Sequence, residues 1–105
     1  MSSVFMSALA KEIAEEKAQG LGHAERTMMA ALEEYRRFTV EPTAGATRCE
    51  REALLWGLTT SLASFIIQRE ACGLTDTDRV LKLYGIPAEA VARLGARPRA
   101  AAAAC

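Results

Sequence analysis

Histidine and cysteine, the side chains most often used as metal ligands and nucleophiles, are scarce in this sequence. The 105 residues contain one histidine, His23, and three cysteines. No cysteine or histidine stands at metal-ligand spacing from His23, so we expect a surface or capping residue there and not a zinc ligand. There is also no P-loop, no dinucleotide glycine fingerprint and no serine-nucleophile elbow. We therefore expect a protein that is not an enzyme, with no metal, no cofactor and no small-molecule substrate.

The acidic residues do not form a convincing ion site either. Asp76, Thr77 and Asp78 begin like a calcium loop, but Val80 occupies the third ligand position and the required glycine and glutamate do not follow. Adjacent glutamates, such as Glu15 and Glu16, diverge by about 100° around a helix and do not share a site. We expect the aspartates to cap a helix and the glutamates to serve solubility.

Long hydrophobic runs are absent. The first ten residues lack a basic leader, and the longest apolar-rich stretch without charge, Ala53 to Ile67, contains glycine, serine and threonine. A membrane span needs about 20 predominantly apolar residues, so no membrane segment is predicted. The expected location is the cytoplasm.

Three cysteines are an odd number and exclude a closed disulfide framework. If residues 47–72 form one helix, Cys49 and Cys72 lie roughly 34 Å apart at about 1.5 Å rise per residue. A disulfide needs Cα atoms within about 7 Å, so these two cysteines are not expected to bridge. This is consistent with a reducing compartment.

Aromatic residues make up only 6% of the chain, whereas alanine is abundant. Alanine is the best helix former and a poor strand former. A chain of this length has room for one core. We predict one all-α domain over residues 1–95, followed by a low-complexity, flexible tail over residues 96–105.

The apolar periodicity predicts a compact bundle of three main helices and two short C-terminal helices. Gly20-Leu21-Gly22 is interpreted as a break that permits a tight reversal between the first two helices. The first helix would bury a face containing Phe5, Leu9 and Ile13, and the second a face containing Met28, Ala31, Leu32 and Tyr35. The main helices are expected at Ser3–Gln19, His23–Phe38 and Thr47–Cys72, and the short helices at Asp78–Tyr84 and Pro87–Leu94.

The third helix has two distinct faces. Thr47 and Glu50 have the spacing of a capping box at its start, and Leu54, Leu55, Leu58, Leu62, Phe65 and Ile66 recur at helical spacing behind it. The opposite side is lined by small residues, so either another helix of the same chain or the same ridge of a second copy could approach it closely. An exposed Trp56 would favour an interface. The candidate interface residues are Ala53, Trp56, Gly57, Thr60, Ser61 and Ser64.

Charge is distributed unevenly although the chain is neutral overall. Residues 1–78 hold 8 basic and 12 acidic residues, whereas residues 79–105 hold 5 basic residues and 1 acidic residue. The basic end can bind an acidic partner or pair head to tail with a second copy. An equal alternative is that both ends of the chain bind no partner and contact only solvent. Candidate contacts to nucleic acid or an acidic partner are Arg79, Lys82, Arg93, Arg97 and Arg99.

The stretch Arg79–Arg93 places two short helices around Gly85 and resembles the helix-turn-helix of bacterial DNA-binding proteins. The resemblance implies DNA contacts from the second short helix. That helix offers mostly alanine, with Glu89 and a single Arg93, so it would read little sequence and mainly contact phosphates. A helical corner that only caps the core explains the same residues.

The leading hypothesis is a small helical interaction protein, an adaptor, inhibitor or regulatory subunit, that binds another macromolecule; a homodimer is compatible with it. The alternative is a dimeric helix-turn-helix-like DNA-binding regulator that uses the basic C-terminal segment. A third hypothesis is a thiol activity at Cys49, which would lie beside Arg48 and Arg51 in a first helical turn, a setting that lowers a thiol pKa. The alanine- and arginine-rich composition suggests a bacterial or phage source.

Overall fold

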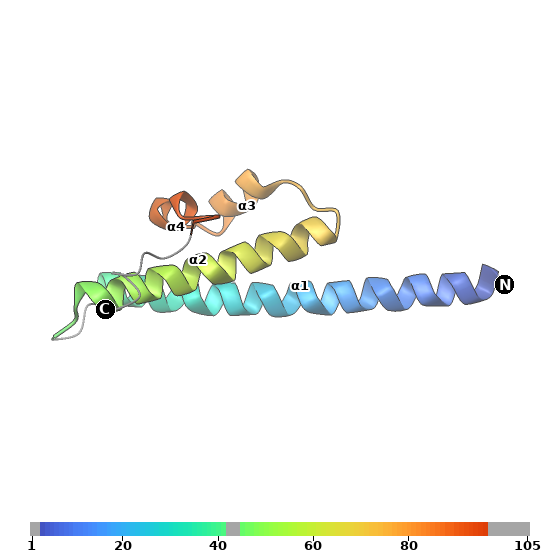
Figure 1. Ribbon diagram of the computed structural model, residues 1–105, viewed down its shortest axis with the longest axis horizontal. Coiled ribbons are helices and arrows are strands. Elements are labelled where there is room, and N and C mark those ends of the chain that lie inside the picture. Colours follow the sequence, from blue (N-terminus) through green and yellow to red (C-terminus); the bar gives the residue numbers. More distant parts are fainter. Residues whose placement is uncertain (1–2, 42–44, 97–105) are drawn as a thin grey trace.

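The chain is all helical, as predicted. A computed structural model describes residues 3–41 and 45–96, and the elements in these ranges are four helices, with no strand among them. Two long helices lie antiparallel and side by side, and two short helices pack on them (Figure 1). The helices are α1 (Ser3–Val40), α2 (Arg48–Ala71), α3 (Thr77–Leu83) and α4 (Ala88–Ala92).

The core lies between the C-terminal half of α1 and the length of α2. Apolar side chains recur every three or four residues on the facing sides of both helices, which gives each helix one buried stripe. The predicted inward residues are confirmed for the most part, although Ala31, Leu54 and Ile66 are only partly buried. The buried residues of the two helices are Ala24, Met28, Leu32 and Tyr35 in α1, and Leu55, Leu58, Thr59, Leu62 and Phe65 in α2.

The predicted break at Gly20-Leu21-Gly22 is wrong, because α1 runs through it without interruption. The separate helices Ser3–Gln19 and His23–Phe38 are therefore one helix, and the main helices number two. Neither glycine has a positive φ, so neither forms a turn. A Cβ on Gly20 would lie 3.1 Å from Oε1 of Gln68. The glycine thus permits a close approach of α2 and does not end the helix.

Local capping signals fix the ends of α2. The Oγ1 atom of Thr47 accepts a hydrogen bond from the backbone N–H of Glu50 at 3.1 Å, as the capping-box spacing predicts. At the other end Gly73 adopts φ +81°, and the N–H of Leu74 donates to the carbonyl oxygen of Arg69 at 2.9 Å. This pattern satisfies the last carbonyl groups of the helix and turns the chain toward α3.

The short helices pack on the hairpin through Val80 and Ala90, which are both buried. The ring of Tyr84 meets that of Phe65 edge to face, with centroids 5.7 Å apart. Arg36 of α1 donates to the carbonyl oxygen of Tyr84 at 2.8 Å, so the turn between α3 and α4 is attached to both long helices. The predicted flexible tail, residues 96–105, lies outside the described residues except for Ala96.

Candidate interaction surface

The N-terminal part of α1 projects beyond the end of α2 (Figure 1). Residues 3–16, called the α1 arm below, span about 21 Å at 1.5 Å per residue. Every residue from Ser3 to Gln19 is exposed. The prediction that this segment buries Phe5, Leu9 and Ile13 is therefore wrong, because α2 ends at Ala71 and does not cover them.

The exposed side of the α1 arm continues the face that packs against α2. Eighteen residues make five full turns of an α-helix, so Met6 points in the direction of Ala24, and Ile13 in the direction of Ala31. Ala24 is buried and Ala31 is partly buried in the core, whereas Met6 is 54% and Ile13 is 46% exposed. Leu9, beside them, is 40% exposed. By the same rule Leu9 points in the direction of Thr27, which is exposed. Met6 and Ile13 thus extend the core face into solvent and Leu9 lies at its edge; the three residues are called the arm stripe.

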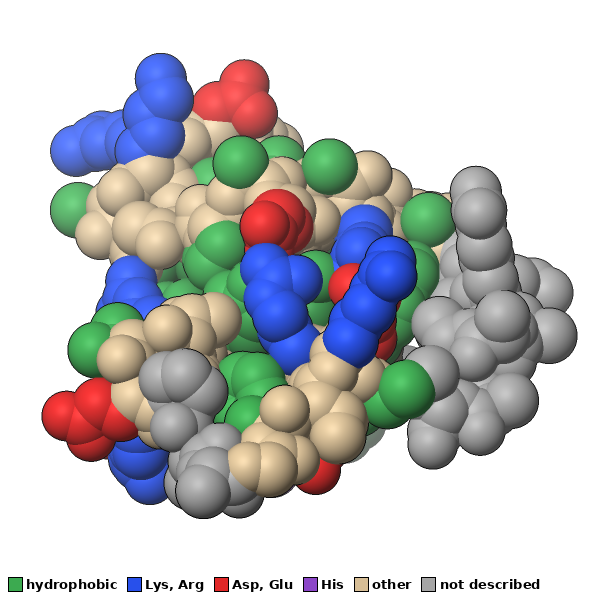
Figure 2. Space-filling view, turned by 90° about the vertical axis from the view of Figure 1, so that its left-hand side faces the viewer, with side chains coloured by type: hydrophobic (Ala, Val, Ile, Leu, Met, Phe, Trp, Pro, Cys, Tyr) green, Lys and Arg blue, Asp and Glu red, His purple; other side chains and the backbone are tan. Residues whose placement is uncertain are grey.

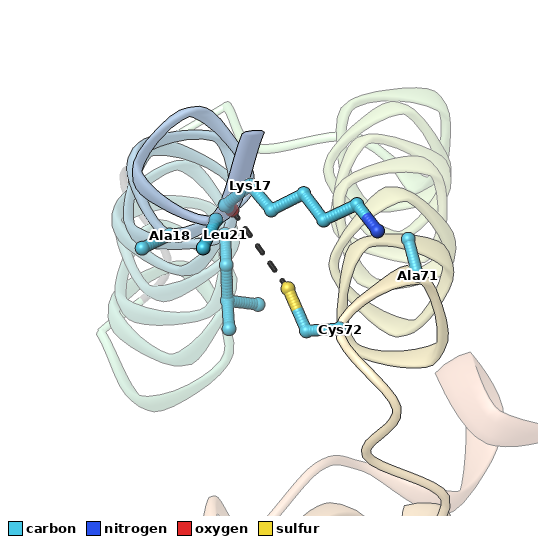
Figure 3. A pocket seen from close by; sticks show the side chains of 6 residues that line it. Lys17, Ala18, Leu21, Ala71 and Cys72 are labelled. Atoms are coloured by element: carbon cyan, nitrogen blue, oxygen red, sulfur yellow. Dashed lines mark hydrogen bonds between the residues drawn. The ribbon is translucent and has the colours of Figure 1, made fainter. Parts of the chain in front are cut away.

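A hollow of about 350 Å³ lies where the α1 arm leaves α2. The Sγ atom of Cys72 donates a hydrogen bond to the carbonyl oxygen of Lys17 at 3.8 Å, and Figure 3 shows the Lys17 side chain stretched toward the end of α2. Cys72 is a free thiol, as expected from its separation from Cys49. The lining residues are Ala14, Lys17, Ala18, Leu21, Ala71 and Cys72.

At the other end of the hairpin, three helices meet in a network of hydrogen bonds and ion pairs. The Tyr35 hydroxyl donates to Oε2 of Glu89 at 2.7 Å, and Arg51 donates to the same oxygen at 2.6 Å. Arg93 donates to Glu52 at 3.2 Å. Figure 2 shows basic and acidic side chains close together in the middle of this end of the molecule. The network attaches α4 to α1 and α2.

The electrostatics of this network fix the direction of its pH dependence. Hydrogen bonds from Tyr35 and Arg51 lower the pKa of the Glu89 carboxyl below its ordinary value of 4.5. Burial, reinforced by the bond to Glu89, raises the pKa of the Tyr35 hydroxyl above 10.0. Because the Glu89 pKa is lowered in the folded chain, its contribution to stability is complete above the ordinary value and is lost as the pH falls below it.

The candidate interface predicted on α2 stays open along most of its length. Ala53, Gly57, Thr60 and Ser64 are exposed, and Ser61 is half-buried. A Cβ on Gly57 would meet no atom within 4 Å, so no helix of the described chain packs there. Within the described residues, the small-residue face of α2 is therefore not covered by other helices of the same chain.

Trp56 is less accessible than an interface tryptophan would be. Its side chain is half-buried, and the Arg93 guanidinium lies 5.2 Å from the ring centroid. The expected exposure of Trp56 is thus corrected, because Arg93 folds back from the end of α4 to cover the ring. Sequence spacing gives no signal for this contact, because Trp56 and Arg93 are 37 positions apart and belong to different helices.

Residues 3–102 match the model of a family described as a family of unknown function (DUF6665). The chain belongs to the DUF6665 family. No curated protein and no solved structure matches the chain. The matched segment begins at Ser3, the first residue of α1, so the α1 arm is part of the sequence that defines DUF6665.

The five basic residues predicted as nucleic-acid contacts do not form one described surface in this DUF6665 member. Arg79 and Lys82 are exposed on α3. Arg93 instead binds Glu52 and covers Trp56. Arg97 and Arg99 lie outside the described residues.

The residues considered for catalysis or metal binding are far apart. Cys49 lies in the first turn of α2, whereas His23 lies opposite the other end of α2, roughly 25 Å away along the hairpin at about 1.5 Å per residue. His23 is exposed, whereas Cys49 is half-buried and disulfide-bonded. The predicted thiol activity at Cys49 is therefore wrong for this structure, because a disulfide leaves no thiol to act as a nucleophile. In the two described segments, no three side chains of histidine, cysteine, aspartate or glutamate are grouped as metal ligands. Within the same segments no helix is long and apolar enough to span a bilayer.

Proposed function

We propose that this DUF6665 member is a non-enzymatic interaction protein of the cytoplasm, an adaptor or regulatory subunit whose binding surface is the α1 arm. The observation that supports it most is the extension of the core face past the end of α2, where Met6, Leu9 and Ile13 are 54%, 40% and 46% exposed. Solvated helix faces are normally polar. A helix whose apolar stripe continues beyond the helix that packs on it can bury that stripe against another macromolecule.

The rest of the chain anchors the second half of α1, from which the arm projects. The hairpin core and the Tyr35–Glu89–Arg51 network hold α1 rigidly from Leu21 onward. A 38-residue helix anchored over its second half presents its first half with little loss of conformational entropy on binding, because the backbone is already ordered. Binding energy then comes from the apolar stripe.

Retention of partners from a cell extract tests the proposal when two matched variants are compared. Leu9→Glu places a charge on the arm stripe. Ala8→Glu introduces the same charge one residue away on the opposite side of the helix, where Ala8 is exposed. We expect the wild type and Ala8→Glu to retain the same macromolecule and Leu9→Glu to lose it. Identical retention by all three would show that the arm is not the binding surface.

The alternative function is a dimeric helix-turn-helix-like DNA-binding regulator. The observation in its favour is that Arg79 and Lys82 are both exposed and stand three residues apart on one side of α3. Phosphate contacts from such residues give salt-sensitive binding with little sequence preference. Binding of a generic duplex at low salt that Arg79→Ala and Lys82→Ala weaken would favour this function, and no binding at low salt would remove it.

A further inference from the structure

The α1 arm is the right length and has the right chemistry to cover a second copy of itself. We infer that two chains associate through their α1 arms, antiparallel, so that each arm lies along the other in the position that α2 occupies farther along α1. This rests on the proposed function, since it names the partner of the same surface. The partner chemistry is a second copy of the DUF6665 chain.

The first argument is geometric. Met6 and Ile13 lie on the side of α1 that α2 covers farther along, Leu9 lies at the edge of that side, and α2 stops at Ala71, beside Lys17. A second helix on this stripe therefore occupies the space beyond the end of α2. In an antiparallel pair the second arm ends at the hollow and its own hairpin lies at the far end. In a parallel pair the second α1 would continue into the space already filled by α2.

The second argument is electrostatic. Residues 3–10 carry no charge, and the charges of the arm begin at Lys11 and Glu12. The antiparallel arrangement places the charged part of each arm, residues 11–17, against the uncharged first turns of the other. A parallel arrangement would bring Glu12, Glu15 and Glu16 of the two copies side by side, and like charges at close range are destabilising.

The third argument concerns area and register. Met6, Leu9 and Ile13 are 54%, 40% and 46% exposed, so an antiparallel pair brings together six partly exposed apolar side chains. Six side chains at these exposed fractions bury less than the roughly 1,000 Å² of a stable specific interface, which places the pair among weak, transient interfaces. With Leu9 near the two-fold axis, Met6 of each copy faces Ile13 of the other. An interface of this size predicts a dimer that dissociates on dilution.

The solution mass of the full chain, measured by light scattering over a range of concentrations, tests this inference. We expect the mass to rise from one chain toward two as the concentration approaches roughly 1 mM, as a weak interface requires. Leu9→Glu should remain a single chain throughout, whereas Ala8→Glu should follow the wild type. A wild type that stays a single chain overturns the inference, and so does a dimer that Leu9→Glu leaves intact.

A mixing experiment tests the orientation. Met6→Glu and Ile13→Lys should each weaken the dimer at least tenfold when alone, because each opposes a charge to an apolar side chain. An equimolar mixture should recover association, since antiparallel pairing places the new glutamate of one chain opposite the new lysine of the other. A mixture as weak as either variant alone overturns the antiparallel arrangement.

These outcomes separate the inference from the proposed function. If the wild type is a single chain at all concentrations but Leu9→Glu still loses a macromolecule from the extract, the self-association is wrong and the interaction function stands. If the wild type is a single chain and all variants retain the same macromolecules, both are wrong.

Discussion

Truncating a leucine to alanine should destabilise the chain strongly in the core and hardly at all on the α1 arm. Leu62 on α2 is 1% exposed and lies in the core with Met28 and Phe65. Replacing it with alanine removes the transfer free energy of three buried carbon atoms and leaves a cavity that rigid neighbours fill only in part. The expected loss in the free energy of unfolding is about 3–4 kcal/mol, within the range of buried leucine truncations.

Leu9 on the α1 arm provides the contrast. It is 40% exposed and belongs to the part of α1 that projects beyond the end of α2 (Figure 1). Alanine has a slightly higher helix propensity than leucine, so in a single chain Leu9→Ala should change the free energy of unfolding by no more than about 0.5 kcal/mol, the usual range for surface substitutions. The difference between the two variants should therefore exceed about 2.5 kcal/mol.

Urea unfolding followed by far-ultraviolet circular dichroism measures this difference, at a concentration where the wild type has the mass of one chain. The slope of the transition should be the same in all three proteins. A loss above about 1.5 kcal/mol for Leu9→Ala would mean that the arm packs against the body of its own chain. A loss below about 1 kcal/mol for Leu62→Ala would mean that the core is assigned to the wrong residues.

Three further substitutions have expected signs that follow from the structure. Glu89→Gln should lower the free energy of unfolding by about 1 kcal/mol at pH 7, a small value because the Glu89 side chain is 52% exposed to solvent. It should also remove part of the stability loss that the wild type shows as the pH falls below 4.5. An unchanged dependence of stability on acid pH would contradict the role of the network. Gly57→Ala should stabilise the fold by about 0.5–1 kcal/mol, because it adds a helix former in the interior of α2 where a Cβ meets nothing within 4 Å. A lower unfolding temperature for this variant would show that the small-residue face of α2 is covered. Gly85→Ala should destabilise the fold by about 1–2 kcal/mol, because φ at Gly85 is +65° and a Cβ would lie 2.9 Å from the Arg36 guanidinium. An unchanged free energy of unfolding in urea would rule out the left-handed turn.

The parts of the fold that depend on local chemistry were predictable from the sequence. The Thr47 cap, the inward stripe through Leu55, Leu58 and Leu62, and the glycine after α2 are short-range signals, and the structure confirms them. Element bounds differ by one to two residues at most ends. Pro87, for example, is the N-cap of α4 and not its first residue, since helix ends are where propensity decides least.

The continuity of α1 was not predicted, because two glycines within three residues suggest a turn. A glycine inside a helix costs only about 1 kcal/mol relative to alanine, and at Gly20 a Cβ would lie only 3.1 Å from Oε1 of Gln68. Leu21, Ala24 and Met28 stand at helical spacing across the glycines, and this spacing predicts one continuous helix. The arm surface was missed for the same reason, because a reversal at Gly20 would have buried it.

The fixed position of Arg93 was out of reach for sequence reasoning. Its contacts with Glu52 and Trp56 join residues that are 41 and 37 positions apart, and they depend on how α4 returns to α2. Sequence spacing reveals partners within one helix, whereas such contacts follow only from the tertiary arrangement.

The distance between residues 7 and 37 tests most directly the claim that α1 is one helix with a projecting arm. Spin labels on unnatural amino acids at Ser7 and Arg37, both exposed, leave the three cysteines untouched, and dilution with unlabelled chain removes distances between copies. Thirty residues of continuous helix predict about 45 Å. A reversal at Gly20-Leu21-Gly22 would place the two labels about 10–15 Å apart, the distance between packed antiparallel helices, and that result would contradict the arm and the interaction function built on it.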